Sequence, residues 1–259
     1  MRKAIVGGLA LVVVALLAWA SSDPWKSKPY DQWDAKDVQK VMNGSPWART
    51  VTVDANWMSG GALSQPESSR APQSAPSGGM GSGGGRGGMG GGGGAPAGGG
   101  GGQSVPEGSV AQASFIVRWV SSRVMREAFV RNLILNGQMK ADEGQKELAQ
   151  TPDTYQVMIV GPQMQPFESV EEAAVKDAAF LEPKKTKERI AASKVEFQRS
   201  SDGKTLRAVV ISFPKRTATS EATITPEEKG TEFSVLVGKT TIKASFDFTK
   251  MYDSTGRDL

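Results

Sequence analysis

The sequence contains no cysteine and no histidine in its 259 residues. Without cysteine the chain forms no disulfide bond and carries no lipid on a cysteine, so its own core has to hold the fold together. Without histidine, Ser-His-Asp triads, Cys-His pairs and histidine-ligated zinc or haem are excluded. We therefore expect no catalytic, cofactor-binding or metal-binding residues of these classes. An enzyme built on this chain would have to use carboxylates, Lys, Tyr, Ser or Thr.

The chain also lacks a strong net charge. Its formal charge is +4, and removal of Arg2 and Lys3 with the predicted signal peptide leaves 29 basic and 27 acidic residues. The densest basic run, Lys184–Arg189, contains no aromatic residue on which a base would stack. We interpret this run as a solvated face and predict no nucleic-acid partner.

Residues 1–20 have the pattern of a secretory signal peptide. Arg2 and Lys3 precede an apolar run over 4–18, and Ala18-Trp19-Ala20 matches a cleavage site. We expect cleavage before Ser21 and a periplasmic or secreted protein. The alternative is a retained membrane anchor, because the apolar run is near the lower length limit of a spanning helix.

Composition divides the remaining chain into a Trp-rich docking segment (21–58), a Gly/Ser/Pro-rich linker (59–108) and a domain of ordinary globular composition (109–259). Residues 78–102 hold 18 of the 31 glycines. The linker has too little apolar content to form a core, so we predict that it is disordered. A flexible linker of this length reaches roughly 35–42 Å, enough to place the first segment anywhere on the domain surface.

The Trp-rich segment carries the predicted docking residues. Asp34 is a suitable N-cap for a helix over 35–42, and residues 49–53 alternate as an edge strand does. So short a segment without disulfides seldom folds alone, so we predict that it packs on its own domain or on another copy. An alternative is an exposed surface for an envelope protein or glycan. The residues that carry either role are Trp25, Trp33, Val38, Trp47 and Trp57.

The large domain alternates strand and helix patterns. Strands are predicted over 114–120 and 154–160, and helices over 122–137, 138–150 and 170–181. Turn residues at 201–203 and 238–239 predict two hairpins. We predict an α+β fold, with one antiparallel or mixed sheet, two or three helices on one face, and the Trp-rich segment on its Gly-rich tether.

Short motifs that occur in enzymes are present, but the residues around them do not fit the chemistry. The sequence Gly238-Lys239-Thr240 has Phe233 where a phosphate loop needs glycine. The S-x-x-K matches at Ser201 and Ser212 fall on a turn and beside a proline, where Lys is not one helical turn from Ser.

The segments QWDAKDVQKVMNGSPWARTVTV, VRWVSSRVMREA, FPKR and ITPEEKG carry a family resemblance. The chain resembles exported bacterial proteins of the GWxTD-domain type, although Gln32 precedes Trp33 and Ala35-Lys36 follow Asp34. This resemblance implies no activity and no functional residues.

These observations support three functional hypotheses. The first is an exported non-enzymatic protein that binds or scaffolds an envelope partner. It becomes membrane-attached only if the signal segment is retained. The others are a carboxylate-dependent enzyme acting on a cell-wall or extracellular polymer and a polysaccharide-binding module.

Overall fold

The structure is a computed structural model that describes residues 23–55, 57 and 111–259. The predicted signal peptide (1–20) and the predicted linker (59–108) lie outside the described residues. Residues 23–55 and 112–259 belong to one compact unit, and residues 56–111 belong to another. All helices and strands named below belong to the first unit.

The predicted α+β class is confirmed, and every strand pair is antiparallel. The strands divide between two main sheets, whereas the sequence predicted one. The first sheet has the order β1 (Ala48–Asp54), β2 (Gln112–Trp119), β3 (Thr154–Val160), β7 (Leu206–Pro214), β6 (Lys194–Arg199). The second has the order β5 (Ile190–Ala191), β4 (Ala179–Pro183), β8 (Gly230–Val237), β9 (Thr240–Asp247). A short pair, β10 (Tyr252–Asp253) with β11 (Gly256–Arg257), follows.

Aromatic side chains join the two main sheets. The ring of Trp119 on β2 lies 5.3 Å from that of Phe246 on β9, and the ring of Phe213 on β7 lies 6.2 Å from that of Phe233 on β8. All four side chains are fully buried. Edge-to-face pairs of this kind contribute about 0.5–1.5 kcal/mol beyond their buried area. The core of the unit therefore lies between the two sheets.

The amino-terminal residues form α2 (Pro24–Ser27), η1 (Tyr30–Gln32), α3 (Ala35–Gly44) and β1. The predicted N-cap is present: the Asp34 carboxylate accepts a hydrogen bond from the Asp37 backbone N–H at 2.8 Å. The predicted strand is also present, because β1 pairs with β2 along its whole length, from Ala48 opposite Arg118 to Asp54 opposite Gln112. β1 and β2 are therefore a hairpin, and residues 55–111 connect two neighbouring positions of one ladder.

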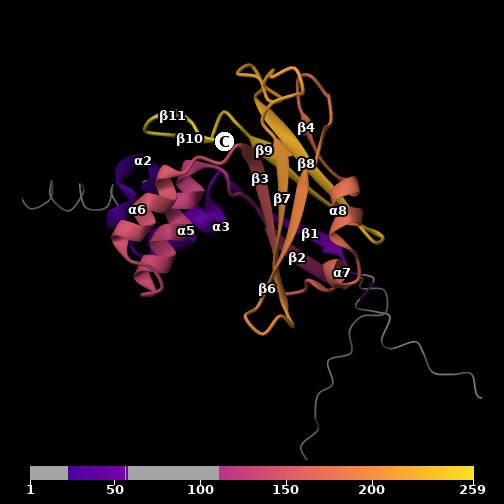
Figure 1. The fold of residues 1–259 in the computed structure, drawn as a ribbon, viewed down its shortest axis with the longest axis horizontal. Coiled ribbons are helices and arrows are strands. Elements are labelled where there is room, and N and C mark those ends of the chain that lie inside the picture. The colour runs from indigo at the N-terminus through magenta and orange to yellow at the C-terminus, as the bar shows by residue number, and fades with distance from the viewer. Residues whose placement is uncertain (1–22, 56, 58–110) are drawn as a thin grey trace, which may run out of the picture. The chain divides into compact units, whose positions relative to one another are not determined.

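The helices form two groups, whereas the sequence predicted them on one face. α5 (Arg123–Leu135) packs with α3 on one side and with α6 (Ala141–Ala149) on another. α5 and α6 approach closely because Gly144 has no side chain: a Cβ atom there would lie 2.5 Å from Val130 Cγ1. α7 (Gln165–Glu168) and α8 (Glu172–Ala178) lie on the other side of the sheets in Figure 1, where they contact β7, β6 and β8.

The predicted helix over 170–181 is shorter in the structure. α8 ends at Ala178, and Ala179–Pro183 form β4, in which Leu181 pairs with Phe233 of β8. Pairing with a strand that is distant in the sequence overrides the local helical pattern here. The connection that follows β4 supplies one wall of the site described below.

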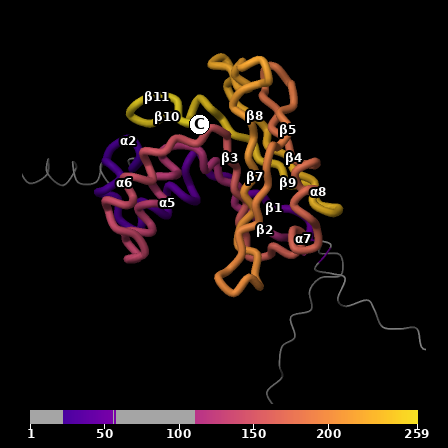
Figure 2. The backbone as a smooth tube through the Cα atoms, viewed as in Figure 1, coloured from indigo at the N-terminus to yellow at the C-terminus, as the bar shows by residue number. Residues whose placement is uncertain are grey.

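The last residues of the chain contact the amino-terminal segment 23–55, and Figure 2 traces both along the backbone. The Trp47 indole N–H donates a hydrogen bond of 2.8 Å to the Asp258 carbonyl oxygen. Within the described ranges, no helix is long and apolar enough to cross a membrane.

Candidate functional site

Four of the five residues predicted for docking lie inside the first unit. Trp25, Trp33, Val38 and Trp47 are buried, whereas Trp57 is partly exposed. The rings of Trp25 and Trp47 meet edge to face, with centroids 5.7 Å apart. Arg131 on α5 donates a hydrogen bond of 2.7 Å from Nε to the Trp33 carbonyl oxygen. The four buried side chains are therefore not exposed platforms for a sugar or a partner.

A hollow with a volume of about 790 Å³ lies elsewhere, between two loops. We call it the first hollow. One wall is the connection from β4 into β5, residues 184–191, and the other is the segment after β7, residues 214–225. Its lining includes Thr186, Glu188, Ile190, Glu221, Thr223 and Thr225. The volume is within the usual range for a small-ligand site.

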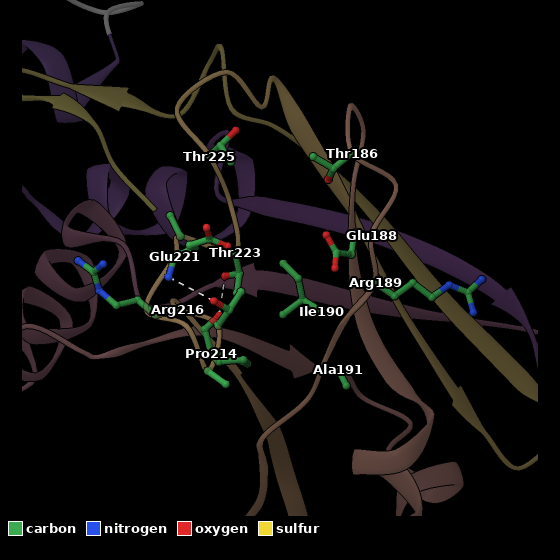
Figure 3. Close-up of a pocket in the computed structure, with 13 residues that line it drawn as sticks. Thr186, Glu188, Arg189, Ile190, Ala191, Pro214, Arg216, Glu221, Thr223 and Thr225 are labelled. Atoms are coloured by element: carbon green, nitrogen blue, oxygen red, sulfur yellow. Dashed lines mark hydrogen bonds between the residues drawn. The ribbon is translucent and has the colours of Figure 1, made fainter.

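Two carboxylates from opposite walls face this hollow. Figure 3 shows Glu188 and Glu221 extending toward the space between the walls, with Ile190 between them. Neither carboxylate forms an ion pair with a Lys or Arg of the described residues. The lining therefore combines two carboxylates that form no ion pair, several threonine hydroxyls, and the apolar side chain of Ile190, which we call the apolar floor of the hollow.

The two arginines of the lining point away from the hollow in Figure 3. Arg189 Nε lies 3.2 Å from Glu182 Oε2, and its guanidinium stacks 4.2 Å from the Phe180 ring centre. Arg216 donates a hydrogen bond of 2.8 Å to the Ser220 carbonyl oxygen. These contacts hold both guanidinium groups outside the hollow, so the charged groups that point into it are the two carboxylates.

A buried glutamate fixes the first wall. The carboxylate of Glu228 is almost fully buried and accepts hydrogen bonds of 2.9 Å from the backbone N–H groups of Lys185 and Thr186. Hydrogen bonds to a charged acceptor are stronger than neutral ones. Because Glu228 follows the second wall in the chain, it links that segment to the first wall.

The second wall is a small irregular hairpin. Arg216 and Ala222 form an isolated antiparallel bridge, and the Thr223 hydroxyl donates a hydrogen bond of 2.7 Å to the Pro214 carbonyl oxygen (Figure 3). These bonds hold Glu221 and Thr223 against the end of β7.

Each wall contains one residue with a left-handed backbone. Among the described residues, Lys187 (φ 59°) and Ser220 (φ 68°) are the only non-glycine residues with positive φ. This conformation costs an ordinary residue about 1–2 kcal/mol. Such residues cluster at functional sites because the surrounding structure has to impose the conformation.

A second hollow, of about 540 Å³, borders the other side of the 214–226 segment. Alternate residues of extended backbone point to opposite sides. Pro214, Arg216, Thr223 and Thr225 line the first hollow, whereas Lys215, Ile224 and Pro226 line the second. Tyr155, Tyr252, Arg257 and Leu259 complete the second hollow.

The start of α5 carries a cluster of charged groups. The Asp258 carboxylate accepts hydrogen bonds from the backbone N–H groups of Arg123 (2.6 Å) and Val124 (2.9 Å), and Arg123 pairs with Asp253 at 2.6 Å. The pKa of Glu127 is raised to about 7, chiefly by burial; Asp258 and Asp253 add to the rise, and Arg123 opposes it. Burial also raises the pKa of Asp258. Among the described side chains, no group of three or more potential ligands is arranged to hold a metal ion.

Sequence analysis did not select the residues of either hollow. Residues 184–189 were interpreted as a solvated face, and all six are exposed. The segment TATSEATIT, residues 217–225, contained a usable signal: it is rich in threonine and lies between two strong strands. The sequence pattern could not show that the segment 217–225 would face residues 186–190, because those residues lie in a different connection between strands.

A scan against protein-family models, a search of curated proteins and a search of solved structures each found no match to this chain. The resemblance to GWxTD-domain proteins stays a prediction from the segments quoted above.

Proposed function

We propose that this chain is an exported, non-enzymatic protein that binds an envelope partner in the first hollow, and that the partner presents a basic group there. The observation that carries the proposal is the pair of unpaired carboxylates, Glu188 and Glu221, directed into one hollow from opposite walls.

The residues that line the first hollow favour a positively charged group on the partner. Carboxylates accept hydrogen bonds but do not donate them, so they match ammonium and guanidinium groups. Both lining arginines are held outside, so none of the described lining residues places a cation in the hollow to compete with such a group. The hydroxyls of Thr186, Thr223 and Thr225 supply further polar positions beside the apolar floor. A lysine or arginine side chain, with its apolar stem and charged end, fits this division.

A tri-lysine peptide is a suitable probe, with binding to the full mature chain measured by calorimetry at low salt. Glu188→Gln and Glu221→Gln each remove one charge and keep the shape of the side chain. We expect each variant to weaken binding by about tenfold, since charged hydrogen bonds contribute about 1.5–3 kcal/mol. Glu171→Gln, at an exposed position on α8's N-cap, is the matched control and should bind as the native chain does. Equal affinity in all three variants would contradict the proposal.

One observation favours a second candidate, a carboxylate-dependent enzyme. Two carboxylates on opposite sides of a cleft are the arrangement that glycoside hydrolysis requires. Incubation with peptidoglycan and with soluble extracellular glycans, followed by measurement of new reducing ends, tests this candidate. Product release that is lost in both Glu188→Gln and Glu221→Gln would establish the enzyme and exclude the non-enzymatic proposal.

A polysaccharide-binding module is less well supported than either, because the four buried docking residues provide no exposed aromatic platform. Tight binding of neutral chito-oligosaccharides, unchanged by salt and by Glu188→Gln, would favour it.

Export rests on residues 1–20 and is tested directly. We expect the protein recovered from the cell envelope or culture medium to begin at Ser21 when its amino terminus is sequenced. Recovery of an intact amino terminus in the membrane fraction would instead support the retained anchor.

A further inference from the structure

We propose that the second hollow binds an oxyanion, a carboxylate or a phosphate, carried on a ligand with a small apolar body. This proposal is independent of the function proposed for the first hollow. It rests on the charges, hydrogen bonds and lining of a different set of residues.

Two cations line this hollow without a carboxylate partner. Neither Lys215 nor Arg257 forms an ion pair with an acidic residue of the described chain. Asp153 and Asp258 act on Lys215 through their charge, but Asp258 already accepts hydrogen bonds from the start of α5. Neither cation is therefore neutralised by a direct ion pair with an Asp or Glu side chain of the described residues.

Arg257 has hydrogen-bonding capacity to spare. Its Nη1 donates to the carbonyl oxygens of Pro226 (2.8 Å) and Thr225 (3.3 Å), and its guanidinium lies 4.7 Å from the Phe248 ring centre. Its Nε and Nη2 are buried and have no hydrogen-bond partner among the residues that the structure describes. Buried donors without acceptors are costly, and a guanidinium edge matches the two oxygens of an oxyanion. The Arg257 side chain as a whole is only partly buried and lines the second hollow, so a small shift of the guanidinium would bring this edge to a ligand oxyanion, which would supply the missing acceptors.

Lys215 supplies the second charge. Its Nζ donates a hydrogen bond of 2.9 Å to the Pro152 carbonyl oxygen and lies 5.4 Å from the Tyr155 ring centre. Burial lowers the pKa of Lys215. A charge that has lost part of its hydration interacts more strongly with a bound anion, and a bound anion would in turn raise that pKa.

The other residues that line the second hollow indicate the chemistry of the rest of the ligand. Tyr155, Ile224, Pro226 and the side chain of Leu259 provide apolar surface beside the two cations. A free inorganic ion would leave this surface uncovered, whereas an aryl or short alkyl group would cover it. The ligand class is thus a small organic carboxylate or phosphate.

The test uses three probes of similar size on the full mature chain: phenyl phosphate, phenylacetate and benzyl alcohol. Binding is followed by calorimetry, and the Lys215 side chain by NMR. We expect at least one oxyanion to bind tenfold or more tightly than benzyl alcohol, and to raise the pKa of Lys215 when bound. The comparison of phenyl phosphate with phenylacetate identifies which oxyanion the site prefers. Equal affinity for all three probes, or no binding of either oxyanion, would overturn the proposal.

Substitutions locate the site. Lys215→Gln should weaken oxyanion binding by about tenfold and leave benzyl alcohol binding unchanged. Lys239→Gln, in the exposed β8–β9 turn, is the matched control and should have no effect. Arg257→Gln should weaken binding further, but Arg257 also holds two carbonyl groups, so Lys215→Gln decides the question if this variant unfolds. An unchanged affinity in Lys215→Gln, or an equal loss in Lys239→Gln, would contradict the proposal.

Discussion

The amino-terminal segment 23–55 and the two loops 184–191 and 214–226 differ in how they use their side chains. The first is rich in tryptophan and places those rings in the core, where they pack against one another and on α5 and the C-terminal residues. The loops are polar, and they place Glu188 and Glu221 at the first hollow and Lys215 at the second. In this protein the aromatic segment stabilises the fold, whereas the polar loops offer the groups that a ligand can contact.

The largest effect expected from this comparison is on stability. Trp47→Ala removes a fully buried ring that contacts Trp25 and donates a hydrogen bond to Asp258. We expect a loss of about 3–5 kcal/mol in the free energy of unfolding, measured by urea denaturation. Leu236→Ala, at an exposed apolar position, is the control and should change stability by less than about 0.5 kcal/mol. A small loss in Trp47→Ala would mean that the amino-terminal segment is not part of the core.

The hairpin of β1 and β2 gives the next effect. Joining Ala55 to Ala111 through Asn-Gly leaves a short loop between the paired residues Asp54 and Gln112. Because loop closure costs less for a short loop, we expect this variant to gain roughly 2 kcal/mol of stability. Thermal unfolding monitored by circular dichroism measures the change. A variant that fails to fold would contradict the register of β1 on β2.

The third effect is a pH dependence from Glu127. Its pKa is about 7 in the folded protein and 4.5 as the unperturbed value, so the folded state holds a proton that the unfolded state has lost. Stability from this group is therefore present below about pH 4.5 and decreases as the pH rises to about 7. Because Glu127 is partly exposed, we expect a contribution of about 1–2 kcal/mol.

Glu127→Gln should abolish this decrease, so that the variant is more stable than the native chain at pH 8 and similar to it at pH 4. Chemical denaturation at both pH values measures the difference. An unchanged difference in stability between native and variant at the two pH values would show that Glu127 titrates normally.

The smallest effect concerns the strained backbone of the loops. Lys187→Gly relieves the left-handed conformation at φ 59° and should stabilise the protein by up to about 1 kcal/mol. Lys26→Gly, on the short helix α2 with negative φ, is the matched control and should be neutral or destabilising. If Lys187→Gly is more stable but binds tri-lysine less well, the strain serves the first hollow. A loss of stability would show that the conformation at Lys187 is not strained.

Local signals in the sequence predicted many of the elements. Asp34 caps α3 as expected, β3 occupies the predicted residues, and the turns at Gly203 and Gly238 join antiparallel strand pairs. Each of these features depends on residues within a few positions of one another. The division into two sheets was missed because periodicity identifies the buried face of a strand but not its neighbour.

The hollows could not be predicted for the same reason. Glu188 and Glu221 lie in separate connections, and they come to face one hollow through the pairing of β4 with β5 and β8 and through the hydrogen bonds of Glu228 to Lys185 and Thr186. Pro214 and Arg216 line the first hollow, whereas Lys215 between them lines the second. This assignment depends on the elements that pack on each side of the segment. Neither fact is contained in a local pattern.

The sequence by itself determined the absence of cysteine and histidine chemistry, the capped helix, the strands and the compositional division of the chain, because composition and short-range periodicity are local properties. Only the tertiary structure decided that Trp33 and Trp47 belong to the core, and that two polar loops enclose one hollow with carboxylates and border another with cations. The physical reason is that burial and the meeting of charges depend on contacts between residues far apart in the chain.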